Sequence, residues 1–195
     1  PQGTISISLP FAGLHNVENA LAAAAFALAV DIPLEYIAQG LMSAKGAQGR
    51  LTFKQQGNWL IIDDTYNANP HSMRAAAQVL AAQSGCKILV LGDIGELGDA
   101  AIEEHFALGQ NLADIALDAV FAVGEFASHT IQGLQSKQSH GQTQIQGRAF
   151  DHKAELLAAL QQFLAQSTHR TASLLFKGSR YTKMESLIAD LGENV

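Results

Sequence analysis

Cysteine is almost absent from this chain of 195 residues. The single cysteine, Cys86, excludes an internal disulfide framework and agrees with a reducing compartment. Long apolar runs are missing too, because the most apolar stretch, "ALAAAAFALAV" at residues 20–30, is too short to span a bilayer. No signal-peptide pattern precedes it. We therefore expect a cytoplasmic protein without a membrane span.

Positive charge is also scarce. Twelve Lys and Arg against 18 Asp and Glu give a formal net charge of -6, which provides no general attraction to nucleic acid or anionic membranes. With 48% apolar and 15% charged residues, the chain is long enough to bury a full core. It begins at Pro1 in the middle of a pattern and without an initiator methionine, so we expect a fragment of a longer protein.

The beginning of the chain differs in pattern from the rest. "TISISLP" at residues 4–10 alternates apolar and polar residues, which predicts a half-buried strand. Helical spacing follows in residues 13–30, and Pro33 favours the start of a second helix. Small residues and glycines at 43–49 are typical of a connector, so we predict two domains, residues 1–46 and residues 47–195.

Short apolar runs alternate with helical patterns in the predicted second domain. A hairpin turning near Gly57 is followed by strand-like runs at 87–93, 118–125, 148–151 and 172–179, with helical patterns between and after them. This alternation predicts an α/β fold with a Rossmann-like, mostly parallel sheet covered by helices on both faces. Ligands of such sheets bind outside the carboxyl ends of the strands.

Two polar clusters follow predicted strands. "DDTYNANP" at 63–70 holds more polar groups than the helix cap that Asn69 and Pro70 could form, although a cap remains an equal alternative for Asn69. "KGSR" at 177–180 combines two cations, a hydroxyl and backbone N–H groups, which suits a carboxylate or phosphate. A capped helix with solvated charges is the alternative for "KGSR".

Several familiar catalytic patterns do not occur. "GDIGELG" at 92–98 lacks the G-x-G-x-x-G spacing, and its acidic residues would repel a pyrophosphate, so we interpret it as a glycine-rich turn or an amine site. The seven histidines show no metal-type spacing, which predicts no structural zinc. The sequence contains neither a G-x-S-x-G elbow nor a G-x-x-x-x-G-K-[ST] phosphate loop.

Five collinear stretches together resemble the Mur ligases. They are "GLHNVENALAA" (13–23), "GRL" (49–51), "IIDDTYNANPHSM" (61–73), "LVLGDIGELG" (89–98) and "FKGSR" (176–180). The combination of "DDTYNANP" with "KGSR" favours the branch that adds a dipeptide over those that add one amino acid. Gly95 departs from the pattern, since the family more often has a larger residue there, and residues 141–149 match nothing specific.

The resemblance implies an ATP-dependent, amide-forming ligase of peptidoglycan precursor synthesis. ATP activates the carboxylate of UDP-N-acetylmuramoyl-tripeptide to an acyl phosphate, which the amine of D-alanyl-D-alanine attacks. Residues 1–46 would then be the end of the central ATP-binding domain, and residues 47–195 the complete C-terminal domain. The phosphate loop, the Mg2+ ligands and the UDP-binding residues would lie upstream, so we expect the chain alone to be inactive and the whole enzyme to be monomeric.

The resemblance also implies roles for individual residues. The ATP-binding set comprises His15, Asn16 and Asn19 at the adenine, Asp64 at the ribose hydroxyls and Arg50 at the terminal phosphate. Arg50 would act catalytically by stabilising the transferred charge. The substrate-binding set comprises Tyr66, Asn67 and Asn69 as one wall of the cleft, and Lys177, Ser179 and Arg180 at the dipeptide carboxylate. Asp93 or Glu96 is a weaker candidate for the ammonium end of the dipeptide.

Two other functions remain open from the sequence. A folylpolyglutamate synthase would share the domain plan but add L-glutamate instead of a dipeptide. A Rossmann-like binding module would have no catalytic activity, and an upstream phosphate loop would exclude it.

Overall fold

The computed structural model describes residues 3–11, 13–45, 48–138, 144–166 and 171–192. The chain divides into two compact units, Pro1–Ala47 and Gln48–Val195, which we describe separately. No helix in the described part of the chain is long and apolar enough to cross a membrane.

The first unit contains two helices, α1 (Leu14–Ala29) and α2 (Leu34–Ser43). As expected, α2 begins next to Pro33, which adopts an extended conformation at the N-cap, and Ile37 and Ala38 are its buried residues. The predicted strand at 4–10 was wrong, because these residues form no regular secondary structure. Alternating residues need a neighbouring strand that pairs with their backbone groups, and the described residues of this unit include no strand.

The second unit is built on one six-stranded sheet. Its strands are β1 (Thr52–Gln56), β2 (Trp59–Asp64), β3 (Cys86–Gly92), β4 (Ala119–Val123), β5 (Gln146–Phe150) and β6 (Ala172–Lys177), in the spatial order β1-β2-β6-β3-β4-β5. Only β1 is antiparallel to its neighbour, since it forms the predicted hairpin with β2. The predicted Rossmann-like, mostly parallel sheet is therefore confirmed.

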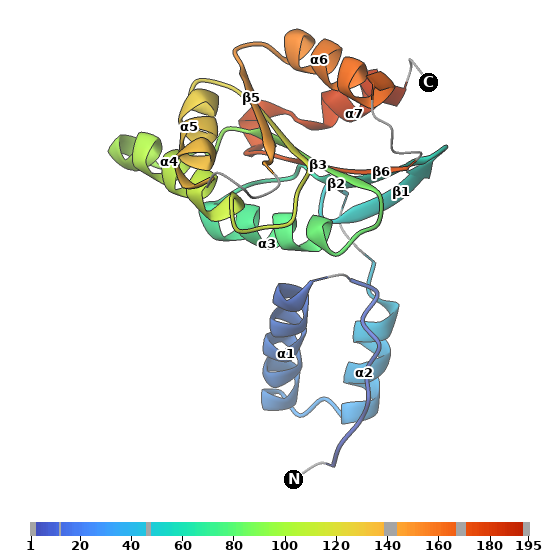
Figure 1. Ribbon diagram of the computed structural model, residues 1–195. Coiled ribbons are helices and arrows are strands. Elements are labelled where there is room, and N and C mark those ends of the chain that lie inside the picture. Colours follow the sequence, from blue (N-terminus) through green and yellow to red (C-terminus); the bar gives the residue numbers. More distant parts are fainter. Residues whose placement is uncertain (1–2, 12, 46–47, 139–143, 167–170, 193–195) are drawn as a thin grey trace. The chain divides into compact units, whose positions relative to one another are not determined.

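Helices cover both faces of this sheet. On one face lie α3 (Pro70–Ala81), α4 (Ala101–Leu112) and α5 (Ala127–Lys137), and on the other lie α6 (Lys153–Gln166) and α7 (Glu185–Gly192) (Figure 1). Two short 3-10 helices, η1 (Gly98–Ala100) and η2 (Arg180–Thr182), precede α4 and α7.

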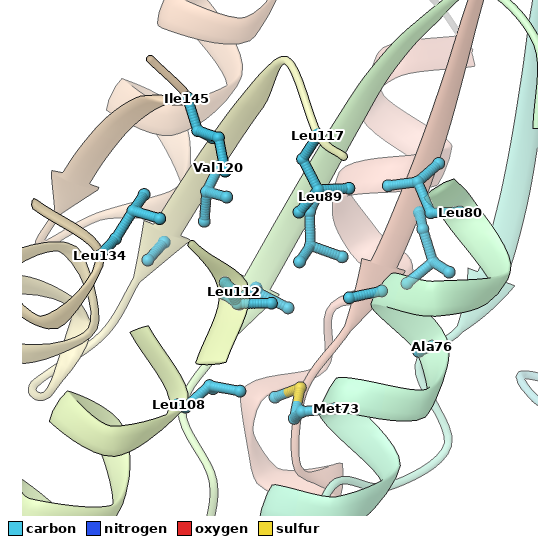
Figure 2. Close-up of a cluster of buried hydrophobic side chains, with 14 of the residues drawn as sticks. Met73, Ala76, Leu80, Leu89, Leu108, Leu112, Leu117, Val120, Leu134 and Ile145 are labelled. Atoms are coloured by element: carbon cyan, nitrogen blue, oxygen red, sulfur yellow. The ribbon is translucent and has the colours of Figure 1, made fainter. Parts of the chain in front are cut away.

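The core consists of two layers, one on each face of the sheet. Leu89 of β3 packs into the layer beneath α3, α4 and α5 (Figure 2), as does Leu91. Ile88 and Val90 of the same strand pack into the layer beneath α6 and α7. Successive side chains of a strand point to opposite faces, so central strands with helices on both sides are apolar throughout.

The position of β6 creates a switch point in the sheet. This last strand lies between β2 and β3, which precede it in the sequence. The helices that follow β2 and β3 cover one face, whereas α7, which follows β6, covers the other. A crevice outside the carboxyl ends of the strands is expected at such a point. The polar clusters at 63–70, 92–98 and 177–180 all come from these strand ends.

Candidate functional site

Lys177 and Asp64 form a buried ion pair at the carboxyl ends of β6 and β2. They are register partners, and Nζ of Lys177 lies 2.6 Å from Oδ2 of Asp64. The same Nζ donates to the backbone carbonyl of Asn67 at 2.9 Å. The side chains are 4% and 13% exposed. Two residues that we had predicted to contact different ligands are thus paired with each other in the structure.

The segment around Arg50 is attached to the end of β2. The backbone N–H of Leu51 donates to Oδ1 of Asp64 at 3.1 Å, and the N–H of Tyr66 donates to the carbonyl of Gly49 at 2.9 Å. The guanidinium of Arg50 lies 4.5 Å from the centre of the Tyr66 ring, which is a cation–π contact. Arg50 and Tyr66 are both exposed, so the cation is accessible to a ligand.

Part of the polar cluster after β2 has local structural roles. Asn69 forms a capping box with Ser72 at the start of α3, with Pro70 in the first turn, so the alternative of a helix cap is confirmed for Asn69. Oδ1 of Asp63 accepts hydrogen bonds from both the N–H and the hydroxyl of Thr65. These bonds shape the turn that carries Tyr66.

Ser179 joins the "KGSR" cluster to the "GDIGELG" loop. Its Oγ accepts a hydrogen bond from the N–H of Gly95 at 2.6 Å, and its own N–H donates to the carbonyl of Asp93 at 3.0 Å. Arg180, next in sequence, has an exposed side chain that pairs with Glu185 at 2.5 Å. The guanidinium of Arg180 is 58% exposed, so it can exchange the partly buried Glu185 for an anionic ligand.

Asp93 is buried and bound by backbone groups. Its carboxylate accepts hydrogen bonds from the N–H groups of Glu125 at 2.8 Å and Phe126 at 3.2 Å. Burial raises the pKa of Asp93, while the bond from Phe126 acts in the opposite direction. A Cβ on Gly124 would lie 2.2 Å from Oδ2 of Asp93, so this contact requires a glycine. The structure therefore gives Asp93 a role in joining the loops after β3 and β4.

His105 is a site residue that the sequence did not reveal. It is buried, its Nδ1 lies 2.7 Å from the carbonyl of Ala101, and its Nε2 accepts from the N–H of Ile94 at 3.0 Å. These partners define a neutral ring with the proton on Nδ1, because a carbonyl can only accept. His105 thereby holds the loop that follows β3, and no sequence spacing indicated this contact.

The remaining predicted residues are placed in less detail. Asn16 and Asn19 lie in the first turns of α1, and Asn19 is exposed. His15 belongs to the same helix, but its side chain lies outside the described structure. Oδ1 of Asn67 accepts from the N–H of Ala68. Glu96 is exposed and has a left-handed backbone with φ of 65°.

Metal ligands do not gather in the described part of the chain, where no group of three His, Cys, Asp or Glu residues could hold an ion. The resemblance places the Mg2+ ligands upstream of this chain. We assign no step to that metal here.

Residues 49–180, which include every predicted site residue of the second unit, match the family described as Mur ligase, glutamate ligase domain. The chain belongs to the Mur ligase family. Among curated relatives, it is 37% identical over 195 residues to the UDP-N-acetylmuramoyl-tripeptide–D-alanyl-D-alanine ligase of Escherichia coli. That alignment covers 100% of this chain and 40% of the relative, so the chain spans less than half of the length of the relative.

Solved structures of MurF ligases are also similar to this chain. MurF from Acinetobacter baumannii is 52% identical, with a TM-score of 0.88 over 99% of this chain and 40% of that one. MurF ligase from Thermotoga maritima, solved in complex with ADP, has a TM-score of 0.75 over 97% of this chain and 40% of that one. At 23% identity, it supports the fold alone.

Proposed function

We propose that the protein carrying this chain is an ATP-dependent ligase that joins D-alanyl-D-alanine to UDP-N-acetylmuramoyl-tripeptide through an acyl phosphate. The observation that carries the proposal is the 52% identity, over 99% of this chain, to MurF from Acinetobacter baumannii. The cations and carboxylates of the site suit such a reaction, because two anionic substrates have to be held together and negative charge moves between them.

Arg50 is the proposed catalytic cation. It is exposed, it is held by contacts on both sides, and a guanidinium stays charged at every relevant pH. We assign to it the stabilisation of charge on the phosphoryl group as the acyl phosphate forms. Asp64 has lone pairs left beside its two bonds to the protein, and these can accept the ribose hydroxyls. Tyr66, Asn67 and Asn69 line the same end of the sheet.

Arg180 is proposed to bind the carboxylate of D-alanyl-D-alanine, and the buried Ser179, bonded through its Oγ to the N–H of Gly95, to hold the segment that carries Arg180 at this site. Arg180 offers a planar cation that can bind a carboxylate in a bidentate manner once it leaves Glu185. Lys177 lies two residues before Ser179, where its ammonium group is paired with the carboxylate of Asp64.

The nucleotide is proposed to be ATP. Support comes from the membership of the chain in the Mur ligase family. The adenine contacts assigned to His15, Asn16 and Asn19 rest on the resemblance alone. Asn19 is the preferred residue because a carboxamide can donate to and accept from an adenine edge.

Release of ADP from the full-length protein tests the proposal. We expect turnover only when UDP-N-acetylmuramoyl-tripeptide, ATP and D-alanyl-D-alanine are all present, with an amide product of matching mass. L-glutamate in place of the dipeptide is the control, because a folylpolyglutamate synthase-like enzyme would use it. Turnover with L-glutamate and none with the dipeptide would refute the proposal.

A further inference from the structure

We propose that Lys177 is a positioning residue for Arg50, and that it acts through the carboxylate of Asp64 and the backbone of Leu51. The inference deepens the proposed function and rests on it for the role of Arg50. It replaces a direct contact between Lys177 and the dipeptide with a contact inside the protein.

The surroundings of Lys177 favour a role within the protein. Its ammonium group already donates to Oδ2 of Asp64 and to the carbonyl of Asn67, at 2.6 and 2.9 Å. The side chain is 4% exposed, which leaves little of it for a ligand. Arg180, by contrast, lies three residues later with an exposed guanidinium. Arg180 is therefore the cation that a ligand can reach, whereas Lys177 binds groups within the protein.

Asp64 links the ammonium group of Lys177 to the backbone of Leu51, next to Arg50. The two oxygens of its carboxylate have different partners, since Oδ2 accepts from Lys177 and Oδ1 accepts from the N–H of Leu51. A carboxylate fixed at one oxygen cannot rotate freely, so the direction of the other oxygen is fixed as well. Charge-assisted bonds of this kind are shorter and stronger than neutral ones.

The segment that carries Arg50 depends on such support. Leu51 has a φ of 43°, in the left-handed region that residues other than glycine rarely adopt. Conformations of this kind persist only where the surroundings hold them. The Leu51 N–H is bound by Asp64, and on the other side the carbonyl of Gly49 is bound by Tyr66. Both neighbours of Arg50 are thus attached to the end of β2.

Arg50 therefore takes its direction from Lys177, although 127 positions separate them in the sequence. Lys177 also lies two residues before Ser179, at the proposed dipeptide site. Movement of the "KGSR" segment when the dipeptide binds would be transmitted to Asp64 and from there to the segment of Arg50. The structure thus connects the proposed dipeptide contacts with the proposed phosphoryl contact.

Steady-state kinetics of Lys177→Met in the full-length ligase is the first test. Methionine fills a similar volume without a charge or a donor. We expect kcat to fall by about 10- to 100-fold, the range for a misplaced catalytic group, while the dipeptide KM stays within about twofold. Adding Lys177→Met to Arg50→Ala should cause no further loss, because both changes remove the same contribution. Lys177→Arg should recover most of the turnover, since it restores a cation beside Asp64.

Lys137→Met is the matched control. Nζ of Lys137 lies 2.6 Å from Oδ2 of Asp114, the same separation as in the buried pair, but these side chains are 46% and 65% exposed. We expect this variant to keep wild-type kinetics. A raised dipeptide KM with unchanged kcat in Lys177→Met, or full additivity with Arg50→Ala, would overturn the proposal in favour of a direct ligand contact.

Hydrogen exchange gives a readout that does not depend on activity. In the full-length protein, peptides covering residues 48–53 should exchange faster in Lys177→Met than in wild type. Unchanged exchange would refute the proposal that Lys177 supports this segment through Asp64. Should Lys177→Met fail to fold, Lys177→Gln takes its place with the same expected direction, since its neutral carboxamide can still bond to Asn67. If the ligase reaction itself is not found, this comparison still decides whether Lys177 supports the segment of Arg50.

Discussion

The ammonium group of Lys177 lies 2.6 Å from the carboxylate of Asp64, at the ends of two neighbouring parallel strands, with the lysine buried and the aspartate mostly buried. The pair connects β6, the last strand in the sequence, to β2, the second strand of the hairpin that comes first in the sequence. Desolvation of two charges offsets much of their attraction, so such a pair adds little net stability over apolar residues. Loss of one partner is costly, because the other charge then stays buried without compensation.

This asymmetry predicts a large difference between two lysine variants in stability. Lys177→Met should lower the free energy of unfolding by about 3–5 kcal/mol, since it leaves Asp64 unpaired. Lys137→Met removes an exposed pair with the same 2.6 Å separation and should cost at most about 1 kcal/mol. Urea denaturation of both variants at neutral pH measures the difference. Equal losses would mean that Asp64 gains solvent or another partner when Lys177 is absent.

Two glycines control the contact between α4 and α5. A Cβ on Gly109 would lie 1.9 Å from the carbonyl oxygen of Thr130, and a Cβ on Gly133 would lie 2.0 Å from that of Phe106. Gly109→Ala and Gly133→Ala should each destabilise the protein by about 1–3 kcal/mol, because the helices have to move apart. This loss exceeds the gain of up to about 1 kcal/mol in helix propensity.

Gly40→Ala is the control for the two glycine variants. Gly40 lies inside α2, and a Cβ there would meet no atom within 4 Å. Only the gain in helix propensity remains, so this variant should be neutral or slightly stabilising by thermal denaturation. Destabilisation by Gly40→Ala equal to that at Gly109 would attribute the effect to something other than the close helix contact.

The raised pKa of Asp93 predicts an unusual dependence of stability on pH. Its proton is held more tightly in the folded chain than in the unfolded chain, where the ordinary value is 3.8. As pH rises from that value through the folded pKa, the folded state alone retains the proton, and the contribution of Asp93 to stability is progressively lost. The advantage of wild type over Asp93→Asn should therefore shrink as pH rises through this window.

Urea denaturation of wild type and Asp93→Asn at several pH values, starting near pH 4, checks this sign. The exposed residue Asp99, changed to asparagine, controls for the loss of one negative charge from the surface. An advantage of wild type that grows with pH would mean that the bonds from Glu125 and Phe126 outweigh burial, with a lowered pKa as the result.

Most of the second unit could be predicted from the sequence because its signals are local. Apolar runs bounded by glycine or polar residues predicted the strands from β2 onward, the turn near Gly57 predicted the hairpin with β1, and Pro70 beside Asn69 predicted the start of α3. The strand predicted at 4–10 was wrong because its alternating pattern is also a local signal, and a local signal does not say whether a second strand lies beside it. A strand exists only where a second strand pairs with it, and alternation by itself contains no information about a partner.

The sequence could not predict which residues of the site contact each other. Polar groups at strand ends were predicted to share one edge, but the Lys177–Asp64 pair depends on the insertion of β6 between β2 and β3. The same holds for Asp93, which interacts with backbone N–H groups more than thirty positions away. Backbone donors carry no residue-specific signal, so Asp93 was interpreted as a candidate for an ammonium group.

The proposed division of labour between two arginines can be tested in the full-length enzyme. Arg50→Ala should lower kcat on the order of 100-fold, the loss of about 3 kcal/mol that is typical of one donor to a developing charge, with little change in the dipeptide KM. Arg180→Ala should mainly raise the dipeptide KM and leave kcat at saturation close to wild type, because a carboxylate that does not react is bound equally in the ground and transition states. Initial rates with each of the three substrates varied in turn separate these effects.

Arg148→Ala is a suitable control for both variants, since this arginine is exposed on β5, at the other edge of the sheet from β1. An unchanged dipeptide KM in Arg180→Ala, or an effect of Arg50→Ala confined to that KM, would contradict the assignment.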